Sequence, residues 1–324
     1  MNIKEFLSEW TNDSPTLLVH TSGSTGQPKP LWVEKRRMEV SARITCDFLG
    51  LKEGDTALLC LPLDYIAGKM MVVRSLVRGL RLVSVEPSGH PLAQPLSSDI
   101  DFAAMVPMQV WNSLRVPEQR HRLMQVRHLI IGGGAIDEDL AAELQAFPNA
   151  VWSTYGMTET LSHVALRRLS GPDASDWYTP FAGVSLSLTA DDCLVVDAPA
   201  VCPAPLVTND IAQLASDGRF RILGRRDNTI CSGGVKIQAE EAERLLRPHF
   251  DAPFLITKRV DPQYGEAVVL LTVSQASDSS LLAVCRRVLP RFWCPRHVVH
   301  IERIPLTATG KPARREAERL AAGV

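Results

Sequence analysis

A segment rich in hydroxyls and glycines, with a lysine at its end, directly follows the apolar run of residues 16–20. It reads Thr21-Ser22-Gly23-Ser24-Thr25-Gly26-Gln27-Pro28-Lys29. Free N–H and O–H donors in such a loop can surround a polyphosphate, and the lysine supplies a point charge. The Gly-Lys-Ser/Thr ending of a Walker A loop is absent, and Pro28 intervenes. The segment therefore indicates a phosphate-binding loop of another type, or else a solvated Ser/Gly turn.

Two further clusters follow predicted strands in the middle of the chain. In Tyr155-Gly156-Met157-Thr158-Glu159 the ring could stack on a base, the threonine could meet a phosphate and the carboxylate could hold Mg²⁺. In Gly132-Gly133-Gly134-Ala135 the bare backbone would let a ligand approach closely, although tight turns often have this composition. Each cluster is compatible with nucleotide binding and with an ordinary strand end.

The remaining candidates lie in the C-terminal third of the chain. Asp210 could accept two hydrogen bonds from ribose hydroxyls, and Arg225 could donate to the same sugar. The same two residues could equally form a surface salt bridge. Lys311 stands on a Thr/Gly loop that would usually be solvated, but a domain movement could deliver it to a phosphate. No single motif decides between these interpretations.

The composition of the 324 residues excludes several classes of protein. With 35 Lys+Arg against 36 Asp+Glu the formal net charge is −1, which argues against nucleic-acid binding through bulk charge. The seven cysteines show no CxxC spacing, so neither a disulfide framework nor a zinc site is expected. The N-terminus is too polar for a secretory signal, and no apolar run is long enough for a membrane span. We therefore expect a cytoplasmic globular protein.

Apolar runs that alternate with helical patterns define the elements that must position these residues. Strands are expected at residues 56–62, 81–87, 101–107, 128–133 and 150–156. Helices are expected between them, at residues 32–51, 66–79 and 135–147 and through Trp111. This alternation predicts an α/β fold with a mostly parallel sheet, whose ligands lie at the carboxyl ends of the strands.

The pattern changes twice in the second half of the chain. From about residue 161, short strands with turn signals predict a β-rich subdomain that extends to about residue 224. A compact α-β-β-α-β unit follows, and its first helix is expected at residues 237–248. The short polar stretch at residues 224–228 is the candidate linker. We therefore expect a core domain at residues 1–226 and a small α+β lid domain at residues 227–324.

Taken in order, the motifs resemble those of the adenylate-forming superfamily, which comprises the AMP-binding acyl- and aryl-CoA ligases, the luciferases and the adenylation domains. The matching stretches are TSGSTGQPK (21–29), LPLDYIAG (61–68), GGGA (132–135), YGMTE (155–159), TND (208–210), GRRD (224–227), SGGVKIQAEE (232–241) and TATGK (307–311). The resemblance implies a large α/β domain with a β-rich subdomain, followed by a mobile C-terminal lid. It also implies ATP, Mg²⁺ and coenzyme A as the cofactor and co-substrates.

The resemblance assigns roles in ATP binding to individual residues. The family's loop around the β- and γ-phosphates matches Thr21, Ser22, Gly23, Ser24, Thr25, Gly26 and Lys29. Adenine would lie between Tyr155-Gly156 on one side and Gly134-Ala135 on the other. Thr158 would touch the α-phosphate and Glu159 would bind Mg²⁺. The ribose clamps match Asp210 and Arg225.

The resemblance also assigns the residues that change between the two half-reactions. Lys311 matches the lysine that bridges the carboxylate and the α-phosphate during adenylation, so Lys29, Thr158, Glu159 and Lys311 form the expected catalytic set. Asp227 matches the hinge of the lid. The segment expected to serve the coenzyme A step contains Ser232, Gly233, Gly234 and Lys236. The acyl-adenylate is attacked by a thiol, so no nucleophile of the protein is required.

The chain departs from the family pattern at several positions. Only 20 residues precede the phosphate loop, so much of the usual N-terminal subdomain is missing, which is compatible with a homodimer or a smaller cleft. Pro30 stands where a glycine is common, and Asn209 replaces the glycine of the usual TGD. Tyr65 replaces the usual histidine beside the acyl pocket, so an altered gate is expected there.

Within the superfamily, the chain most resembles the o-succinylbenzoate–CoA ligases of menaquinone biosynthesis. Gly68-Lys69-Met70-Met71-Val72-Val73-Arg74 resembles the pocket helix of that group. The small-molecule acid is expected to be aromatic and dicarboxylic, with Lys69 or Arg74 meeting its second carboxylate. Other residues expected along the acid pocket are Tyr65, Gly68, Gly132, Gly133, Ser162 and His163.

Two other functions remain open at this stage. Asp64 could hold a substrate ammonium, as in an amino-acid adenylation domain. The short front portion is also compatible with a nucleotide-binding protein that has no catalytic activity, although the presence of Glu159 and Lys311 disfavours that function.

Overall fold

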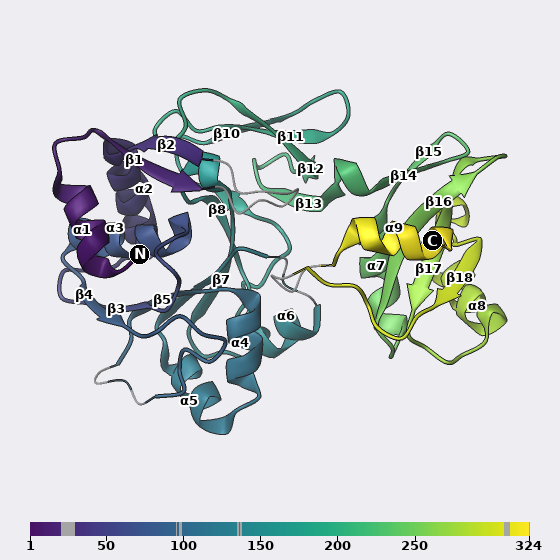
Figure 1. Cartoon of the computed structure of the whole chain (residues 1–324), viewed down its shortest axis with the longest axis horizontal. Helices are drawn as coiled ribbons and strands as arrows, with labels where there is room; N and C mark the ends of the chain where they lie inside the picture. Colours follow the sequence, from purple (N-terminus) through teal and green to yellow (C-terminus); the bar gives the residue numbers. More distant parts are fainter. Residues whose placement is uncertain are drawn as a thin grey trace. The chain divides into compact units, whose positions relative to one another are not determined.

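The computed structural model describes residues 1–20, 30–94, 96, 99–134, 136, 138–307 and 312–323 (Figure 1). The chain divides into two compact units. The first contains residues 1–187, 195–206 and 215–220, and the second contains residues 188–194, 207–214 and 221–324. None of the helices in the described ranges has both the length and the apolar composition that a membrane crossing requires.

Seven strands form the main sheet of the first unit, in the order β4-β3-β5-β6-β7-β8-β9 (Figure 1). Their bounds are β3 Thr56–Leu59, β4 Arg81–Ser84, β5 Phe102–Met105, β6 His128–Ile131, β7 Ala150–Gly156, β8 His163–Arg168 and β9 Thr179–Pro180. The strands from β4 to β7 pair in parallel, whereas β8 and β9 are antiparallel. The predicted α/β class with a mostly parallel sheet is thereby confirmed.

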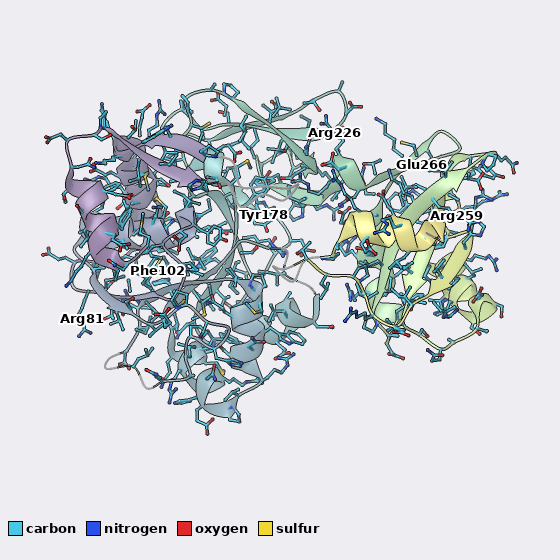
Figure 2. All side chains as sticks on the ribbon, in the orientation of Figure 1. Arg81, Phe102, Tyr178, Arg226, Arg259 and Glu266 are labelled. Carbon is cyan, nitrogen blue, oxygen red and sulfur yellow. The ribbon has the colours of Figure 1, made fainter. Side chains whose placement is uncertain are left out.

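Burial on both faces explains why the central strands were recognisable in the sequence. Every residue of β3 and β5 is buried, including Phe102, which is labelled in Figure 2. Parallel strands covered on both faces read as continuous apolar runs. The helices among them are α2 Lys35–Phe48, α3 Ile66–Arg78, α4 Pro107–Leu114, α5 Pro117–Gln125 and α6 Glu138–Gln145. Helix α3 ends where Gly79 adopts a left-handed conformation, with φ at 66°.

The structure differs from the prediction at both ends of the phosphate-loop region. Residues expected to begin a helix instead form β2 Pro30–Glu34, which pairs antiparallel with β1 Thr16–His20. The pairing satisfies backbone groups of β1 and brings Leu17 opposite Val33, both of them buried. Helix α1 Ile3–Thr11, which the sequence analysis did not identify, begins with a capping box.

Strand β8 was expected in the β-rich subdomain but belongs to the main sheet. The turn η1 Thr158–Thr160 returns the chain directly beside β7, where β8 can complete the ladder. The other four short strands form a separate sheet in the order β10-β11-β12-β13. They are β10 Ser185–Leu188, β11 Cys193–Asp197, β12 Leu206–Leu214 and β13 Phe220–Arg225, and they contribute residues to both units.

A five-stranded sheet and three helices form the C-terminal part of the second unit (Figure 1). The strands follow the order β15-β14-β17-β16, with β18 paired in parallel to β17. Their bounds are β14 Thr229–Ser232, β15 Val235–Gln238, β16 Phe254–Asp261, β17 Gly265–Thr272 and β18 His297–His300. The helices are α7 Ala239–Leu246, α8 Asp278–Val288 and α9 Arg314–Ala322.

Alternate residues of β16 and β17 supply two separate apolar clusters. Ile256 and Leu270 pack in a cluster with residues of α7 and α8. Leu255 and Leu271 pack instead in a cluster with Ala317 of α9. Because successive side chains of a strand point to opposite faces, the two clusters lie on opposite faces of this sheet. The helix expected at residue 237 begins two residues later because β15 pairs with β14 through Gln238.

Candidate active site

The carboxyl ends of β6 and β7 lie side by side, because the two strands pair in parallel from His128 to Ile131. Gly132 follows β6 and touches β7. A Cβ at this position would be 2.3 Å from the hydroxyl oxygen of Thr154. Gly133 has φ at 78°, a conformation that favours glycine. Packing against β7 therefore requires glycine at position 132, and backbone conformation favours it at position 133. With Gly134 next in the chain, this edge has three residues without side chains.

An aromatic cluster holds Tyr155 at the end of β7. Its ring centroid lies 5.0 Å from that of Phe220 and 5.9 Å from that of Tyr178, with edge-to-face geometry in both contacts. Tyr178, labelled in Figure 2, stacks on Phe220 and shares a 2.8 Å hydrogen bond with the hydroxyl of Ser153. Tyr155 is half-buried, so the cluster fixes a ring that can lie against a base.

The turn between β7 and β8 carries the other residues expected around the nucleotide. A Cβ on Gly156 would be 2.3 Å from the carbonyl oxygen of Ser162, so the two strands meet here through a glycine. Thr158 is buried in η1. Glu159 is exposed and has no hydrogen-bond or ion-pair partner within the described chain. Leu161 closes the turn with φ at 66°, which is strained for a branched side chain.

Arg74 of α3 points to the same turn. Its Nη2 donates a 2.5 Å hydrogen bond to the hydroxyl of Ser162, and only 2% of the residue is exposed. Burial lowers the pKa of Arg74 to about 10 despite the opposing effect of Cys46. Over the part of the chain that the structure describes, Arg74 forms no ion pair, and its Nε has no hydrogen-bond partner. A buried guanidinium without a carboxylate is a strong anion site.

The buried imidazole of His163 lies next to Ser162. Burial, followed by the charge of Arg74, holds the pKa of His163 well below the ordinary histidine value. The ring is therefore neutral at physiological pH. Its two nitrogens each lie 3.2 Å from a hydroxyl oxygen, that of Ser162 on one side and that of Thr45 of α2 on the other.

The structure separates Lys69 from Arg74, although both lie on α3. The Nζ of Lys69 is 3.2 Å from the sulfur of Met1 and 5.3 Å from the ring centroid of Phe6, so it faces α1. Burial lowers its pKa. At the start of α3, a Cβ on Gly68 would be 2.3 Å from the carbonyl oxygen of Pro62, and Tyr65 is exposed. Arg74, Ser162 and His163 are thus brought together, and Lys69 is not among them.

The second unit holds the expected ribose and lid residues. Nη1 of Arg225 donates a 2.9 Å hydrogen bond to Asp210, and Nη2 of Arg225 lies 3.7 Å from Asp227. Gly233 and Gly234 form the turn between β14 and β15 with positive φ, after the buried Ser232. Lys236 forms an exposed 2.8 Å ion pair with Asp191, which raises the pKa of the lysine.

Several of the predicted residues lie outside the described ranges: Thr21, Ser22, Gly23, Ser24, Thr25, Gly26, Lys29, Ala135 and Lys311. Conversely, the sequence analysis did not identify Thr45, Tyr178 or Phe220. Tertiary packing brings each of the three to the site. No sequence motif marks such a contact, because a single threonine or aromatic residue in a helix or strand is common.

Two protein families match most of the chain. The AMP-binding enzyme family matches residues 4–207, and the AMP-binding enzyme C-terminal domain matches residues 259–311. The 2-succinylbenzoate–CoA ligase of Lactococcus lactis is 25% identical, over 95% of this chain and 72% of that enzyme. The enzyme of the same name from Salmonella typhimurium is 28% identical, over 88% of this chain and 64% of that enzyme.

Solved structures give a consistent result. An AMP-forming acyl-CoA synthetase/AMP-acid ligase II-like protein from Dyadobacter fermentans is 32% identical, with a TM-score of 0.67 over 96% of this chain and 91% of its own. The o-succinylbenzoate–CoA synthetase of Bacillus subtilis, solved with ATP and magnesium, has the same fold at 23% identity, with a TM-score of 0.74 over 92% and 69% of the two chains. With the family match covering well over half of its length, this chain belongs to the AMP-binding enzymes.

Proposed function

We propose that the chain is an ATP-dependent acid–CoA ligase whose acid is o-succinylbenzoate, acting in menaquinone biosynthesis. It would convert the carboxylate and ATP to an acyl-adenylate and pyrophosphate, and then transfer the acyl group to coenzyme A. The observation that carries the proposal is the buried guanidinium of Arg74, which forms no ion pair within the described residues and donates a hydrogen bond to Ser162, three residues beyond Glu159. The relatives named 2-succinylbenzoate–CoA ligase support the same substrate.

In the proposed complex, the two carboxylates of the acid would have separate partners in the first unit. Tyr155, Thr158 and Glu159 stand at the carboxyl end of β7, where ligands of such sheets bind. Arg74 reaches the end of the same turn. One carboxylate would therefore react at the α-phosphate while the second pairs with the guanidinium fork, whose planar donors match a carboxylate.

The proposed nucleotide contacts follow the family assignment. The phosphate loop at residues 21–29 would hold the β- and γ-phosphates, and adenine would lie between Tyr155 and the glycine segment at residues 132–135. Asp210 and Arg225, which already pair at 2.9 Å, would hold the ribose. The charge that builds on the phosphoryl oxygens would be neutralised by Lys311, and losing one such contact usually costs about 10²–10³ in rate.

The residues present are suitable for magnesium. Glu159 offers an exposed carboxylate without a partner in the described chain, and hard oxygen donors are those that Mg²⁺ prefers. No three His, Cys, Asp or Glu side chains gather into a metal-binding group within the described residues. Glu159 would therefore share the ion with phosphate oxygens and water, and the ion would supply charge neutralisation at the phosphates.

The remaining parts of the proposal concern larger units. A core domain at residues 1–226 and a lid at residues 227–324 would turn about Asp227, so that Lys311 serves adenylation and residues 232–236 serve the coenzyme A step. We further propose that the enzyme is cytoplasmic and can form a homodimer.

Turnover with a panel of acids tests the proposal. Release of AMP and of pyrophosphate is measured with ATP, Mg²⁺ and coenzyme A, using o-succinylbenzoate, a fatty acid and an amino acid. We expect coenzyme A-dependent AMP release with o-succinylbenzoate alone. Arg74→Met should raise the KM for this acid by about two orders of magnitude, because a charge-assisted bidentate pair is lost. Turnover of a fatty or amino acid but not of o-succinylbenzoate would refute the substrate, and ATP binding without pyrophosphate release would refute the activity.

A further inference from the structure

Four side chains from three parts of the first unit form one continuous chain of hydrogen bonds. It runs from Arg74 of α3 to Ser162, then to His163 at the start of β8, and ends at Thr45 of α2. The successive distances are 2.5 Å from Arg74 Nη2 to Ser162 Oγ, 3.2 Å from Ser162 Oγ to His163 Nδ1, and 3.2 Å from His163 Nε2 to Thr45 Oγ1. The proposed acid site includes Arg74 and Ser162, but nothing so far assigns a role to Thr45.

One arrangement of protons satisfies every contact in this chain. The hydroxyl of Thr45 lies 3.1 Å from the carbonyl oxygen of Ser41, which can only accept, so the threonine donates there. The oxygen of Thr45 must then accept from Nε2–H of His163. Because the buried ring is neutral, its Nδ1 carries no proton and accepts from the hydroxyl of Ser162. The oxygen of Ser162 is left to accept from the guanidinium.

This arrangement holds the guanidinium in one orientation, in which some of its N–H groups lack a strong acceptor among the described residues. One N–H of Arg74 donates to Ser162, and Nη1 faces the sulfur of Met71 at 3.8 Å, which is a weak acceptor. The Nε is buried and has no partner in the described chain. A buried donor on a cation is costly when unsatisfied, so an anion would stabilise the Nε edge of the guanidinium, which we call its open edge because Nε has no partner in the described residues.

We propose that Thr45 and His163 are positioning residues that hold the guanidinium of Arg74 with its open edge toward the second carboxylate of the acid, and so set the preference for dicarboxylic over monocarboxylic acids. This inference rests on the proposed acid–CoA ligase function. Its physical basis is that the Nε2–H imidazole accepts the hydroxyl proton of Ser162 and leaves both lone pairs of that oxygen for Arg74, whereas the Nδ1–H tautomer would occupy one of them. Thr45 selects this tautomer because its own proton is committed to Ser41.

The test compares two acids that differ only in the second carboxylate. These are o-succinylbenzoate and 4-oxo-4-phenylbutanoate, which lacks the ring carboxylate. Thr45→Val keeps the shape of the side chain but removes the acceptor for Nε2–H, and Thr45→Ser restores it. We expect Thr45→Val to raise the KM for o-succinylbenzoate about tenfold, the effect of one buried hydrogen bond, with the KM for ATP and for the monocarboxylate changed less than about twofold. Thr45→Ser should return the KM to near the wild-type value.

Ser75→Ala is the matched control, because Ser75 is also buried on α3 but its hydroxyl bonds only within the helix, to Met71. Ser75→Ala should leave the KM for both acids unchanged. His163→Gln is a second variant in case Thr45→Val does not fold, since a glutamine cannot hold both hydroxyls at the fixed spacing of a ring. His163→Gln should show the same selective rise in the KM for o-succinylbenzoate.

The outcomes separate the inference from the function on which it rests. Suppose that the wild-type enzyme prefers o-succinylbenzoate. The positioning role alone would then be overturned if Thr45→Val kept this preference or raised the KM for both acids equally. A wild-type enzyme that does not use o-succinylbenzoate would overturn the proposed substrate and this inference with it.

Discussion

Arg74, Ser162, His163 and Thr45 are joined by one chain of hydrogen bonds within the first unit. Arg74, Ser162 and His163 were expected near one pocket from their place in the sequence, and the structure joins them by hydrogen bonds. Thr45 could not be expected there. It is a helical residue 118 positions from His163, and only the packing of α2 brings the two together.

The neutral imidazole of His163 predicts a dependence of stability on pH. In the unfolded chain this histidine takes up a proton near its ordinary pKa of about 6.5, whereas in the folded protein it stays neutral because its pKa is held well below that value. The unfolded state therefore binds more protons as the pH falls below 6.5. The free energy of unfolding should decrease by up to about 1.4 kcal/mol per pH unit over this range.

Thermal unfolding between pH 7 and pH 5 measures this effect. His163→Gln should reduce the dependence and leave the smaller slope due to His128 and His297, whose pKa values are also lowered by burial. A wild-type slope that survives in His163→Gln would show that other groups produce it.

At the scale of the elements, the sequence predicts periodic segments well and competing pairings poorly. The buried strands β3, β5 and β6 follow directly from their apolar runs. The last residues of β2 and β15 were assigned to the helices expected at residues 32–51 and 237–248, because local periodicity cannot reveal that a neighbouring strand needs a partner. The same reason explains why β8 was not assigned to the main sheet.

An ion pair between two helices anchors α9, the helix that follows Lys311 in the sequence. Arg314, at the start of α9, donates two hydrogen bonds to the carboxylate of Glu243 in α7, at 2.6 and 2.8 Å, and both side chains are mostly buried. Just before it, the backbone N–H of Ala313 donates a 2.9 Å hydrogen bond to the carbonyl oxygen of Pro305. Breaking a buried pair on one side typically costs about 3–5 kcal/mol, because a charge is left without a partner.

Glu243→Gln should therefore release α9. Hydrogen–deuterium exchange of its amides should become at least tenfold faster, and the adenylation rate should fall because the helix that follows Lys311 in the sequence loses its anchor. Glu316→Gln is the control, since it breaks an exposed pair with Arg319 on the same helix and should cost less than about 1 kcal/mol. Equal exchange in the two variants would contradict an anchoring role for Glu243.

At the scale of the whole molecule, the proposal depends on a lid that serves two half-reactions. Lys311→Ala should reduce adenylation by about 10²–10³, because one charge contact in the transition state is lost, yet it should spare thioester formation from supplied acyl-adenylate. Single-turnover measurements of the two steps test this expectation. Arg315→Ala, which removes an exposed cation four residues away, should affect neither step. An equal loss of both steps in Lys311→Ala would argue against the lid movement.

The sheet of the second unit has one consequence beyond catalysis. Its strands β16 and β17 are covered on both faces, by residues of α7 and α8 on one and of α9 on the other, so this module carries its own interior. Such a module can be transferred between related proteins. Because both apolar clusters lie within residues 229–324, we expect this segment to keep its hydrophobic centre when it replaces the matching segment of a related enzyme.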